Sequence, residues 1–270
     1  MEESMKVIEP GDWLGLQGQV VLITGAAGGI GVATARAFAG TGARLALTDL
    51  RAEEGEELAA GLRGNSVEAM FLEADITDPD AVASVTNVVA AQFGRLDALV
   101  HIAGASGRRH GDGPAHSATL QGWDWVMNLN LRSAFLCARS ALPHMLPAGS
   151  GSITFLSSVQ ALAGGGQAFD AVGYAAAKTG LLGMTRAMAT CYASEGVRVN
   201  AICAGTVRTP MSARVQQDPE AAAYVARMQP LAGGPGEASD VASAAVWLTS
   251  RAARFVTGVA LPVDGGWSAA

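Results

Sequence analysis

The sequence predicts an α/β fold, a doubly wound, seven-stranded parallel sheet with helices on both faces. Short apolar segments rich in β-formers alternate along the chain with longer Ala-rich amphipathic segments, the pattern of strands and their covering helices. The chain has 270 residues, 50% hydrophobic, with 34 glycines, which suits one large core with many tight turns. No linker-like tract or internal repeat divides it. We expect an N-terminal extension over 1–17 and a single domain over 18–270.

The predicted elements follow in order along the chain. The short apolar segments predict strands at about 19–24, 43–49, 67–74, 96–102, 151–157, 197–203 and 258–263. The amphipathic segments predict helices near 29–40, 52–63, 79–93, 119–146, 171–194 and 237–249, with a further helical or irregular stretch at 210–230.

Charge and composition argue against several classes of partner. The formal net charge is −6, whereas nucleic acids and anionic membranes select for clustered Lys and Arg. No uncharged apolar run reaches the ~18 residues of a membrane helix. The N-terminal segment is acidic where a signal peptide is basic. We therefore expect neither nucleic acid nor membrane as a partner.

The cysteines indicate a cytoplasmic protein without disulfides. Cys137, Cys191 and Cys203 are odd in number, far apart and inside apolar segments, which is typical of buried thiols in a reducing compartment. The sequence contains no Cys-x-x-Cys and no His pair at helical spacing, so we expect no metal site.

A glycine-rich turn joins the first predicted strand to the first predicted helix. The strand ends at Thr24, and Gly25, Gly29 and Gly31 follow. Glycine there allows a tight turn and close approach of a pyrophosphate, and the helix N-terminus offers unpaired N–H groups. The spacing Gly-x-x-x-Gly-x-Gly differs from the general dinucleotide fingerprint Gly-x-Gly-x-x-Gly. The turn is either a dinucleotide site or a purely structural feature.

The second predicted strand ends at Asp49, which favours NAD(H) over NADP(H). Asp49 follows Gly31 by 18 residues, near the ~20 expected for a carboxylate that binds the ribose hydroxyls. Its charge would repel the 2′-phosphate of NADP, and the middle of the glycine turn, at 26–28, has no basic residue. Arg51 is the kind of residue that a 2′-phosphate prefers. The alternative role for Asp49 is to cap the helix near Ala52.

A tyrosine and a lysine lie one helical turn apart in the segment Tyr174-Ala-Ala-Ala-Lys178. Positions i and i+4 share a helix face, so the two side chains can act together. A phenol has a pKa of ~10, which must fall by a few units for proton exchange near neutrality, and a neighbouring ammonium can lower it. Upstream, the strand that ends in Ser157-Ser158 brings a hydroxyl to the carboxyl edge of the sheet, where it can polarise a substrate carbonyl.

From about Gly18 to the C-terminus, the chain resembles the short-chain dehydrogenase/reductase family, a Rossmann-like fold. The matching motifs occur in order: Thr24-Gly25-x-x-x-Gly29-Ile30-Gly31, Ala74-Asp75-Ile76, Ala103-Gly104, Asn130-Leu131, Ser158, Tyr174 with Lys178, Arg198-Val199-Asn200 and Val263-Asp264-Gly265-Gly266. The resemblance implies that Tyr174 is the general acid/base and Lys178 its pKa partner. It also implies that Ser158 orients the carbonyl and that Asn130 anchors a proton-relay water.

The resemblance further implies a cofactor-binding set, a substrate pocket and a homotetramer. Asp75 and Ile76 are expected to contact the adenine, and Val207 and Thr209 the carboxamide. The remaining cofactor contacts are Gly25, Gly29, Ile30, Asp49, Leu50, Ala103, Gly104, Tyr174 and Lys178. Gln160 and Met211 are expected in the substrate pocket. Arg108, Arg109 and His110 either attract a substrate carboxylate or phosphate, or form a solvated polar loop.

The sequence departs from the family pattern at three places. His101-Ile102-Ala103-Gly104 stands where the family has Asn-Asn-Ala-Gly, and we interpret His101 as a structural histidine with both ring nitrogens bonded. Ala204-Gly205 replaces Pro-Gly after the sixth strand. The interval from Ser158 to Tyr174 is a few residues longer than usual. Ser157 is the alternative to Ser158, although its side chain should point to the other face of the strand.

The predicted function is that of an oxidoreductase. It transfers a hydride between NAD(H) and a small-molecule secondary alcohol or ketone, with Tyr174 as general acid/base. Two alternatives remain, an NADP-dependent 3-oxoacyl-thioester reductase and a non-catalytic NAD-binding redox sensor. No Gly-x-Ser-x-Gly elbow supports a serine hydrolase.

Overall fold

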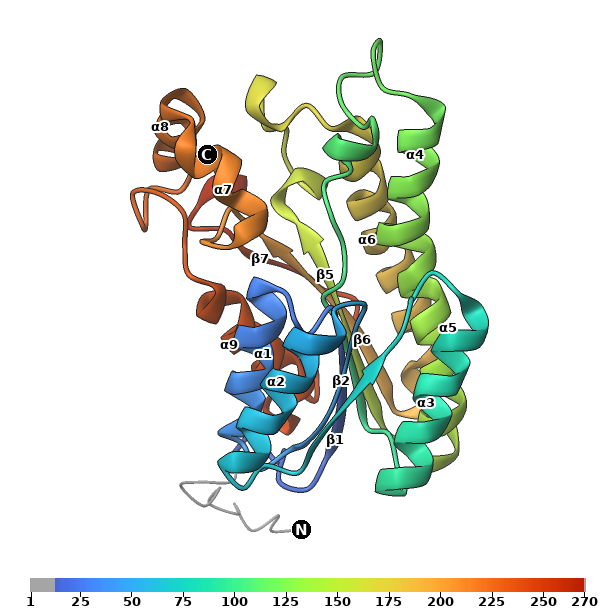
Figure 1. The fold of residues 1–270 in the computed structure, drawn as a ribbon. Coiled ribbons are helices and arrows are strands. Elements are labelled where there is room, and N and C mark those ends of the chain that lie inside the picture. Colours follow the sequence, from blue (N-terminus) through green and yellow to red (C-terminus); the bar gives the residue numbers. More distant parts are fainter. Residues whose placement is uncertain (1–12, 270) are drawn as a thin grey trace, which may run out of the picture.

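A computed structural model describes residues 13–269 of the protein (Figure 1). Within these residues lies an all-parallel seven-stranded sheet of order β3-β2-β1-β4-β5-β6-β7. The strands are β1 Val20–Thr24, β2 Arg44–Asp49, β3 Ala69–Glu73, β4 Ala98–His101, β5 Gly151–Ser158, β6 Val197–Ala204 and β7 Ala260–Val263. The strand order reverses between β1 and β4, and ligand sites of such sheets lie at the carboxyl edge near that point.

Helices cover both faces of the sheet (Figure 1). One face carries α1 (Gly29–Ala39), α2 (Ala52–Gly64) and α9 (Ala238–Thr249). The other carries α3 (Pro79–Phe93), α5 (Ser133–Met145) and α6 (Val172–Tyr192), and α4 (Leu120–Met127) packs against α6. Two short helices, α7 (Ala213–Gln217) and α8 (Pro219–Met228), lie beyond the carboxyl ends of the strands.

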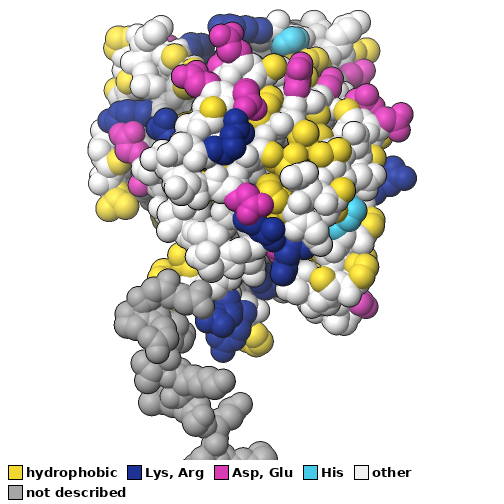
Figure 2. All heavy atoms as spheres, turned by 60° about the horizontal axis from the view of Figure 1, so that its bottom comes forward, with side chains coloured by type: hydrophobic (Ala, Val, Ile, Leu, Met, Phe, Trp, Pro, Cys, Tyr) yellow, Lys and Arg dark blue, Asp and Glu magenta, His cyan; other side chains and the backbone are white. Residues whose placement is uncertain are grey.

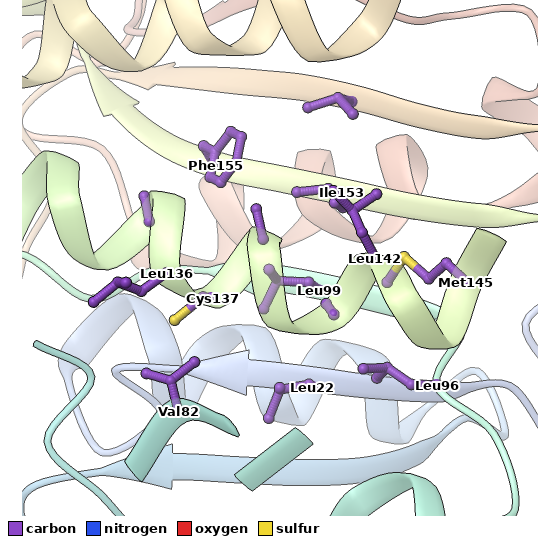
Figure 3. Close-up of a cluster of buried hydrophobic side chains, with 14 of the residues drawn as sticks. Leu22, Val82, Leu96, Leu99, Leu136, Cys137, Leu142, Met145, Ile153 and Phe155 are labelled. Atoms are coloured by element: carbon purple, nitrogen blue, oxygen red, sulfur yellow. The ribbon is translucent and has the colours of Figure 1, made fainter. Parts of the chain in front are cut away.

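The core has two main layers, one on each face of the sheet. Figure 3 shows the layer under α3 and α5, in which Leu22, Leu99 and Ile153 of three neighbouring strands meet Leu142 and Met145 of α5. These strands are buried on both faces, which explains why their sequences are continuously apolar instead of alternating. A third, smaller cluster packs α7 and α8 onto the carboxyl edge through Val159, Val215, Ala221, Val225 and Trp267.

The predicted strands are confirmed, with ends that differ by no more than about two residues. The predicted helix over 119–146 is confirmed, and a π-helical turn, Asn128–Arg132, lies between its two α-helical parts, α4 and α5. The stretch 210–230 forms a 3-10 turn followed by α7 and α8. Pro219 lacks the N–H that would continue α7, and the Asp218 carboxylate caps α8.

One of the three cysteines does not fit the prediction. Cys137 and Cys203 are buried, but Cys191 is exposed. It lies near the end of α6, on the side turned away from the sheet, where an apolar neighbourhood in sequence does not mean burial.

The structure can be compared with the expected N-terminal extension and with the expected absence of membrane and nucleic-acid partners. Residues 1–12 of the expected extension lie outside the described residues, whereas Leu16 is buried in the core. Within residues 13–269, no helix combines the length and apolarity needed to cross a bilayer. On the face that Figure 2 shows, Lys and Arg side chains are interspersed with Asp and Glu.

Candidate active site

A cavity of about 440 Å³ opens at the carboxyl edge of the sheet, a size usual for small-molecule sites. Its wall brings together residues from the ends of β1 to β6, from α6 and from α7. Every site residue expected from the sequence lines it except Asn130: Gly25, Gly29, Ile30, Asp49, Leu50, Asp75, Ile76, Ala103, Gly104, Ser158, Gln160, Tyr174, Lys178, Val207, Thr209 and Met211. These positions, distant in sequence, therefore share one site.

The backbone of the glycine turn forms a cradle, and side chains in place of the glycines would clash with its surroundings. Gly25 has φ +68°, and a Cβ on it would lie 2.7 Å from the backbone of Ala103. A Cβ on Gly29 would lie 2.7 Å from Thr209 Cγ2. The N-terminus of α1 has no side-chain cap and no acidic residue in its first turn. Its N–H groups and positive dipole end suit a pyrophosphate, so the residues present fit a dinucleotide.

Asp49 lies at the end of β2, beside this cradle. Asp49 Oδ2 accepts a hydrogen bond from the Ala27 N–H at 3.0 Å, which holds the carboxylate against the glycine turn. Arg51 forms an ion pair with Asp49, with Nε 3.2 Å from Oδ1. Arg51, not Asp49, is the N-cap residue of α2, although Asp49 Oδ1 accepts a hydrogen bond from the Arg51 N–H at 3.1 Å.

Ser158, Tyr174 and Lys178 converge at the middle of the cavity. Ser158 and Tyr174 both line the cavity, and the interaction of the Ser158 side chain with the phenol acts to lower the pKa of Tyr174. Lys178 is 2% exposed, its Nζ donates to the Leu156 carbonyl at 2.8 Å, and it lies 5.6 Å from the centre of the Tyr174 ring. Ser157 also lines the cavity, but its Oγ donates to the main-chain oxygen of Lys178 at 2.8 Å. The geometry therefore favours Ser158 as the partner of the tyrosine.

Burial sets the charge states of this group. It raises the pKa of Tyr174 to about 12, although the interaction with Ser158 opposes the shift. It lowers the pKa of Lys178 to about 8. The expectation that Lys178 lowers the pKa of the Tyr174 phenol is therefore wrong. The cost of burying the phenolate is larger than the stabilisation that it gains from its contacts. Tyr174 holds its proton at neutral pH, which suits donation to a ketone oxygen.

Asn130 lies just behind the cavity, in the π-helical turn between α4 and α5. Its Nδ2 donates to the carbonyls of Ala105 (2.9 Å) and Val126 (3.1 Å), and its Oδ1 accepts from the Ala105 N–H at 3.1 Å. A Cβ on Gly104 would lie 2.5 Å from Asn130 Oδ1 and 3.0 Å from Lys178 Nζ. Asn130 thus fastens the loop after β4 beside the lysine. Its expected role toward a water stays a prediction.

His101 is a structural histidine, as expected. It is fully buried at the end of β4, with Nδ1 2.9 Å from the Thr24 hydroxyl and Nε2 3.4 Å from the Ser133 hydroxyl. Burial, reinforced by the charge of Lys178, lowers the pKa of His101 to about 3. A neutral imidazole therefore links β1, β4 and α5 where the family pattern has an asparagine.

Sequence reasoning missed Asp112, which positions the helix that carries Tyr174. Asp112 is buried in the loop between β4 and α4, and its carboxylate accepts from the N–H groups of Gly173 and Tyr174, both at 2.9 Å. A negative charge at a helix N-terminus is stabilising. The contact joins residues 62 apart in the chain, so no local pattern indicates it.

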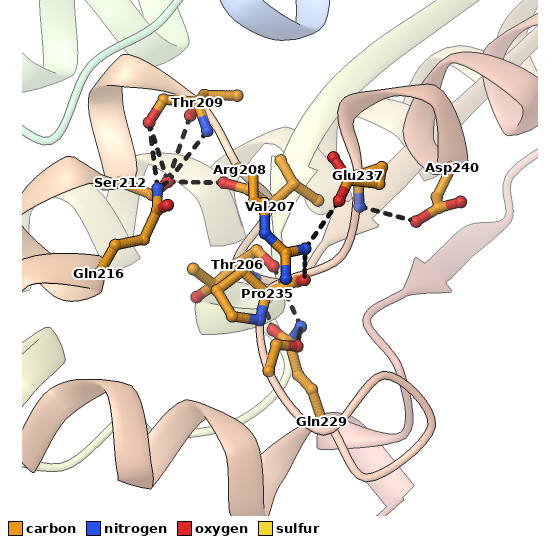
Figure 4. A network of polar contacts seen from close by, with 11 residues as sticks. Thr206, Val207, Arg208, Thr209, Ser212, Gln216, Gln229, Pro235, Glu237 and Asp240 are labelled. Atoms are coloured by element: carbon orange, nitrogen blue, oxygen red, sulfur yellow. Dashed lines mark hydrogen bonds and ion pairs between the residues drawn. The ribbon is translucent and has the colours of Figure 1, made fainter. Parts of the chain in front are cut away.

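Gln229 is a second residue that sequence reasoning missed (Figure 4). It is 2% exposed; its Nε2 donates to the carbonyls of Thr206 and Gly234, both at 3.0 Å, and its Oε1 accepts from the Thr206 N–H at 2.6 Å. These bonds hold the segment before Val207. A Cβ on Gly205 would lie 2.7 Å from Gln229 Oε1, which explains why the glycine is kept although the expected proline is not.

Arg108, Arg109 and His110, further along the loop after β4, do not line the cavity. Arg108 is paired with the Asp170 carboxylate, and the His110 ring stacks on Trp125 with centroids 3.7 Å apart. Arg109 is exposed. Between the two interpretations of this loop, the structure favours the polar surface loop. Among residues 13–269, no group of three or more His, Cys, Asp or Glu side chains is placed to bind a metal ion.

Comparison with known proteins agrees with this geometry. A family model described as enoyl-(acyl carrier protein) reductase matches residues 25–268. The cis-4-hydroxycyclohexanecarboxylate dehydrogenase of Sinomonas cyclohexanicum is 40% identical over 251 residues, covering 93% of this chain and 97% of the relative. The levodione reductase of Leifsonia aquatica is 36% identical over 260 residues, covering 93% and 95%. The solved structure of a short-chain type dehydrogenase/reductase from Mycobacterium ulcerans superposes with a TM-score of 0.87 at 29% identity, covering 94% and 91%.

Proposed function

The chain belongs to the short-chain dehydrogenase/reductase family, and we propose that it interconverts a secondary alcohol and a ketone with NAD(H), Tyr174 exchanging the proton. The observation that carries this proposal is the convergence of Ser158, Tyr174 and Lys178 on one cavity with the glycine cradle. Of the relatives named above, one is by its name a dehydrogenase of a hydroxycyclohexanecarboxylate and the other a reductase of levodione. A small cyclic alcohol is accordingly the first substrate to try.

Each residue of the group has a defined task in this proposal. The bound dinucleotide supplies or takes up the hydride at C4 of its nicotinamide. Ser158 donates a hydrogen bond to the substrate oxygen, and Tyr174 donates its proton to that oxygen in reduction or accepts one from it in oxidation. Lys178, a donor held next to the tyrosine ring, binds the nicotinamide ribose and adds positive charge when protonated. Because Tyr174 must be protonated for reduction, ketone reduction is favoured at neutral pH and below, and alcohol oxidation at alkaline pH.

The preference for NAD(H) rests on Asp49. Its carboxylate, held by the Ala27 N–H, is placed to accept ribose hydroxyls and to repel a 2′-phosphate. We expect wild type to have a higher kcat/KM with NAD than with NADP. Asp49→Ser should lower the NAD-to-NADP ratio of kcat/KM about 10- to 100-fold, since hydrogen bonds to a charged group contribute about 1.5–3 kcal/mol. It also frees Arg51 for the 2′-phosphate.

The measurement is steady-state kinetics with both dinucleotides on one alcohol. Arg51→Ala is the matched control: it should keep the NAD preference and weaken any activity with NADP. A wild type that prefers NADP would contradict the assignment. It would instead be the result expected for the alternative, an NADP-dependent 3-oxoacyl-thioester reductase.

We also propose that the protein is cytoplasmic and forms a homotetramer. Large apolar side chains are exposed on the helices between β4 and β5, where a second copy can cover them: Leu120, Trp123 and Phe135.

A further inference from the structure

The substrate end of the cavity is the part of its wall next to Ser158 and Tyr174 that the β5–α6 connection and the segment through α7 form. Its apolar lining residues are Val159, Phe169, Pro210, Met211 and Val215, and its polar ones are Gln160, Thr209, Ser212 and Arg214. The other charged residues that line the cavity within residues 13–269 lie elsewhere. Asp49, Arg51 and Asp75 follow β2 and β3, and Lys178 is bonded to β5. Arg214 is therefore the one charged side chain at the substrate end of the described protein.

Arg214 is exposed at the start of α7, which is anchored to the protein next to it, and its side chain donates one hydrogen bond. Its Nη2 donates to the Ala168 carbonyl at 2.7 Å, in the 3-10 turn Gln167–Phe169 of the β5–α6 connection. Its neighbour Val215 is buried in the cluster that contains Trp267, which anchors α7. The Ala168 carbonyl also accepts from Arg108 Nη2 at 3.4 Å. A neutral acceptor that two arginines share therefore orients the Arg214 guanidinium at the cavity wall.

Arg51, the other arginine that lines the cavity, is paired with the Asp49 carboxylate. Two further arginines, Arg108 and Arg208, are paired with Asp170 and Glu237. No ion pair among residues 13–269 includes Arg214. A guanidinium has five N–H donors in a planar fork, and one bond to Ala168 leaves most of them available. A carboxylate matches that fork, with two parallel charge-assisted hydrogen bonds.

We propose that Arg214 is a substrate-binding residue and that the preferred alcohol carries a carboxylate, which Arg214 binds while the hydroxyl meets Tyr174. This rests on the proposed alcohol–ketone function and deepens it. The apolar residues between the two polar ends, Phe169 and Val215 among them, contact a hydrocarbon spacer such as a ring. The arginine then supplies both the affinity for acids over neutral alcohols and the orientation of the spacer in the cavity.

The test compares acids with neutral alcohols of the same shape. The probes are cis-3- and cis-4-hydroxycyclohexanecarboxylate, each paired with the corresponding cis-methylcyclohexanol, with NAD as oxidant. We expect wild type to have a kcat/KM at least about 10-fold higher for the acid in one of the two pairs. Arg214→Gln should lower that acid-to-neutral ratio about 10- to 100-fold, as the loss of hydrogen bonds to a charged group predicts. Arg214→Lys should retain part of the preference.

Arg109→Gln is the matched control, because Arg109 is exposed and outside the cavity wall. It should leave the ratio unchanged. The neutral alcohols show whether Arg214→Gln merely loosens α7, since that would lower both rates together and leave the ratio at its wild-type value, which would overturn the inference. Equal rates on acid and neutral alcohol in both pairs would also overturn it and leave the proposed function standing. A wild type that oxidises none of the four probes or other secondary alcohols would overturn both.

Discussion

Tyr174→Phe is expected to abolish alcohol–ketone interconversion while leaving the fold and cofactor binding in place. The substitution removes one oxygen, the atom that exchanges the proton with the substrate. General acid/base groups contribute about 10²- to 10⁴-fold to rate, so kcat should fall within that range or below detection. The phenylalanine ring still fills the space beside Lys178. The fold loses little more than the interaction of the phenol with Ser158, a cost of about 1 kcal/mol.

The measurements are kcat, the dissociation constant for NAD and the unfolding midpoint of the same preparations. Tyr192→Phe is the matched control, because Tyr192 lies at the other end of α6 and outside the cavity wall. It should retain wild-type turnover. Near wild-type turnover in Tyr174→Phe would remove the tyrosine from the mechanism and would favour a different proton donor.

Lys178→Met is expected to lower the activity of the protein and to raise its stability. The buried ammonium has its pKa lowered from 10.5 to about 8, so keeping it charged in the folded protein costs on the order of 3 kcal/mol at neutral pH. Methionine removes that cost and fits the same apolar space, so the unfolding midpoint should rise at pH 7. Turnover should fall about 10²-fold or more, since the positive charge next to the tyrosine and the donor for the ribose are both lost.

The pH dependence of this stability difference has a definite sign. Between pH 8 and 10.5 the unfolded chain keeps the lysine proton while the folded protein loses it, so wild-type stability rises with pH across that window. The advantage of Lys178→Met, measured by denaturant unfolding at several pH values, should therefore shrink from pH 8 upward. A difference that is independent of pH, or a less stable variant at pH 7, would show that Lys178 is not a buried charge.

Much of the fold could be predicted because its signals are local. Each strand of a parallel sheet covered on both faces is a continuous apolar run, and each helix has its own period, so the positions of both could be read along the chain. The glycine turn and the Tyr174–Lys178 pair are also local, since the second is a single helical turn. The π-helical turn within the helix over 119–146 was not predicted. It carries Asn130, which is hydrogen-bonded to Ala105, 25 residues away.

The rest of the site depends on contacts between distant parts of the chain. Asp112 meets the start of α6 across 62 residues, Gln229 meets Thr206 across 23, and Arg214 meets Ala168 across 46. No periodicity or spacing encodes such pairings. The sign of the Tyr174 pKa shift was mispredicted for a related reason, because desolvation depends on burial in three dimensions and not on the neighbour one turn away.

The central claim is that a secondary alcohol loses its carbinol hydrogen directly to a nicotinamide dinucleotide in this cavity. The most direct measurement is to incubate the enzyme with NAD and a cyclohexanol derivative that is deuterated at the carbinol carbon, and to locate the label by NMR. The account predicts one deuterium at C4 of the reduced dinucleotide for each ketone formed. Deuterium released to the solvent, or ketone formed without reduction of the dinucleotide, would contradict it.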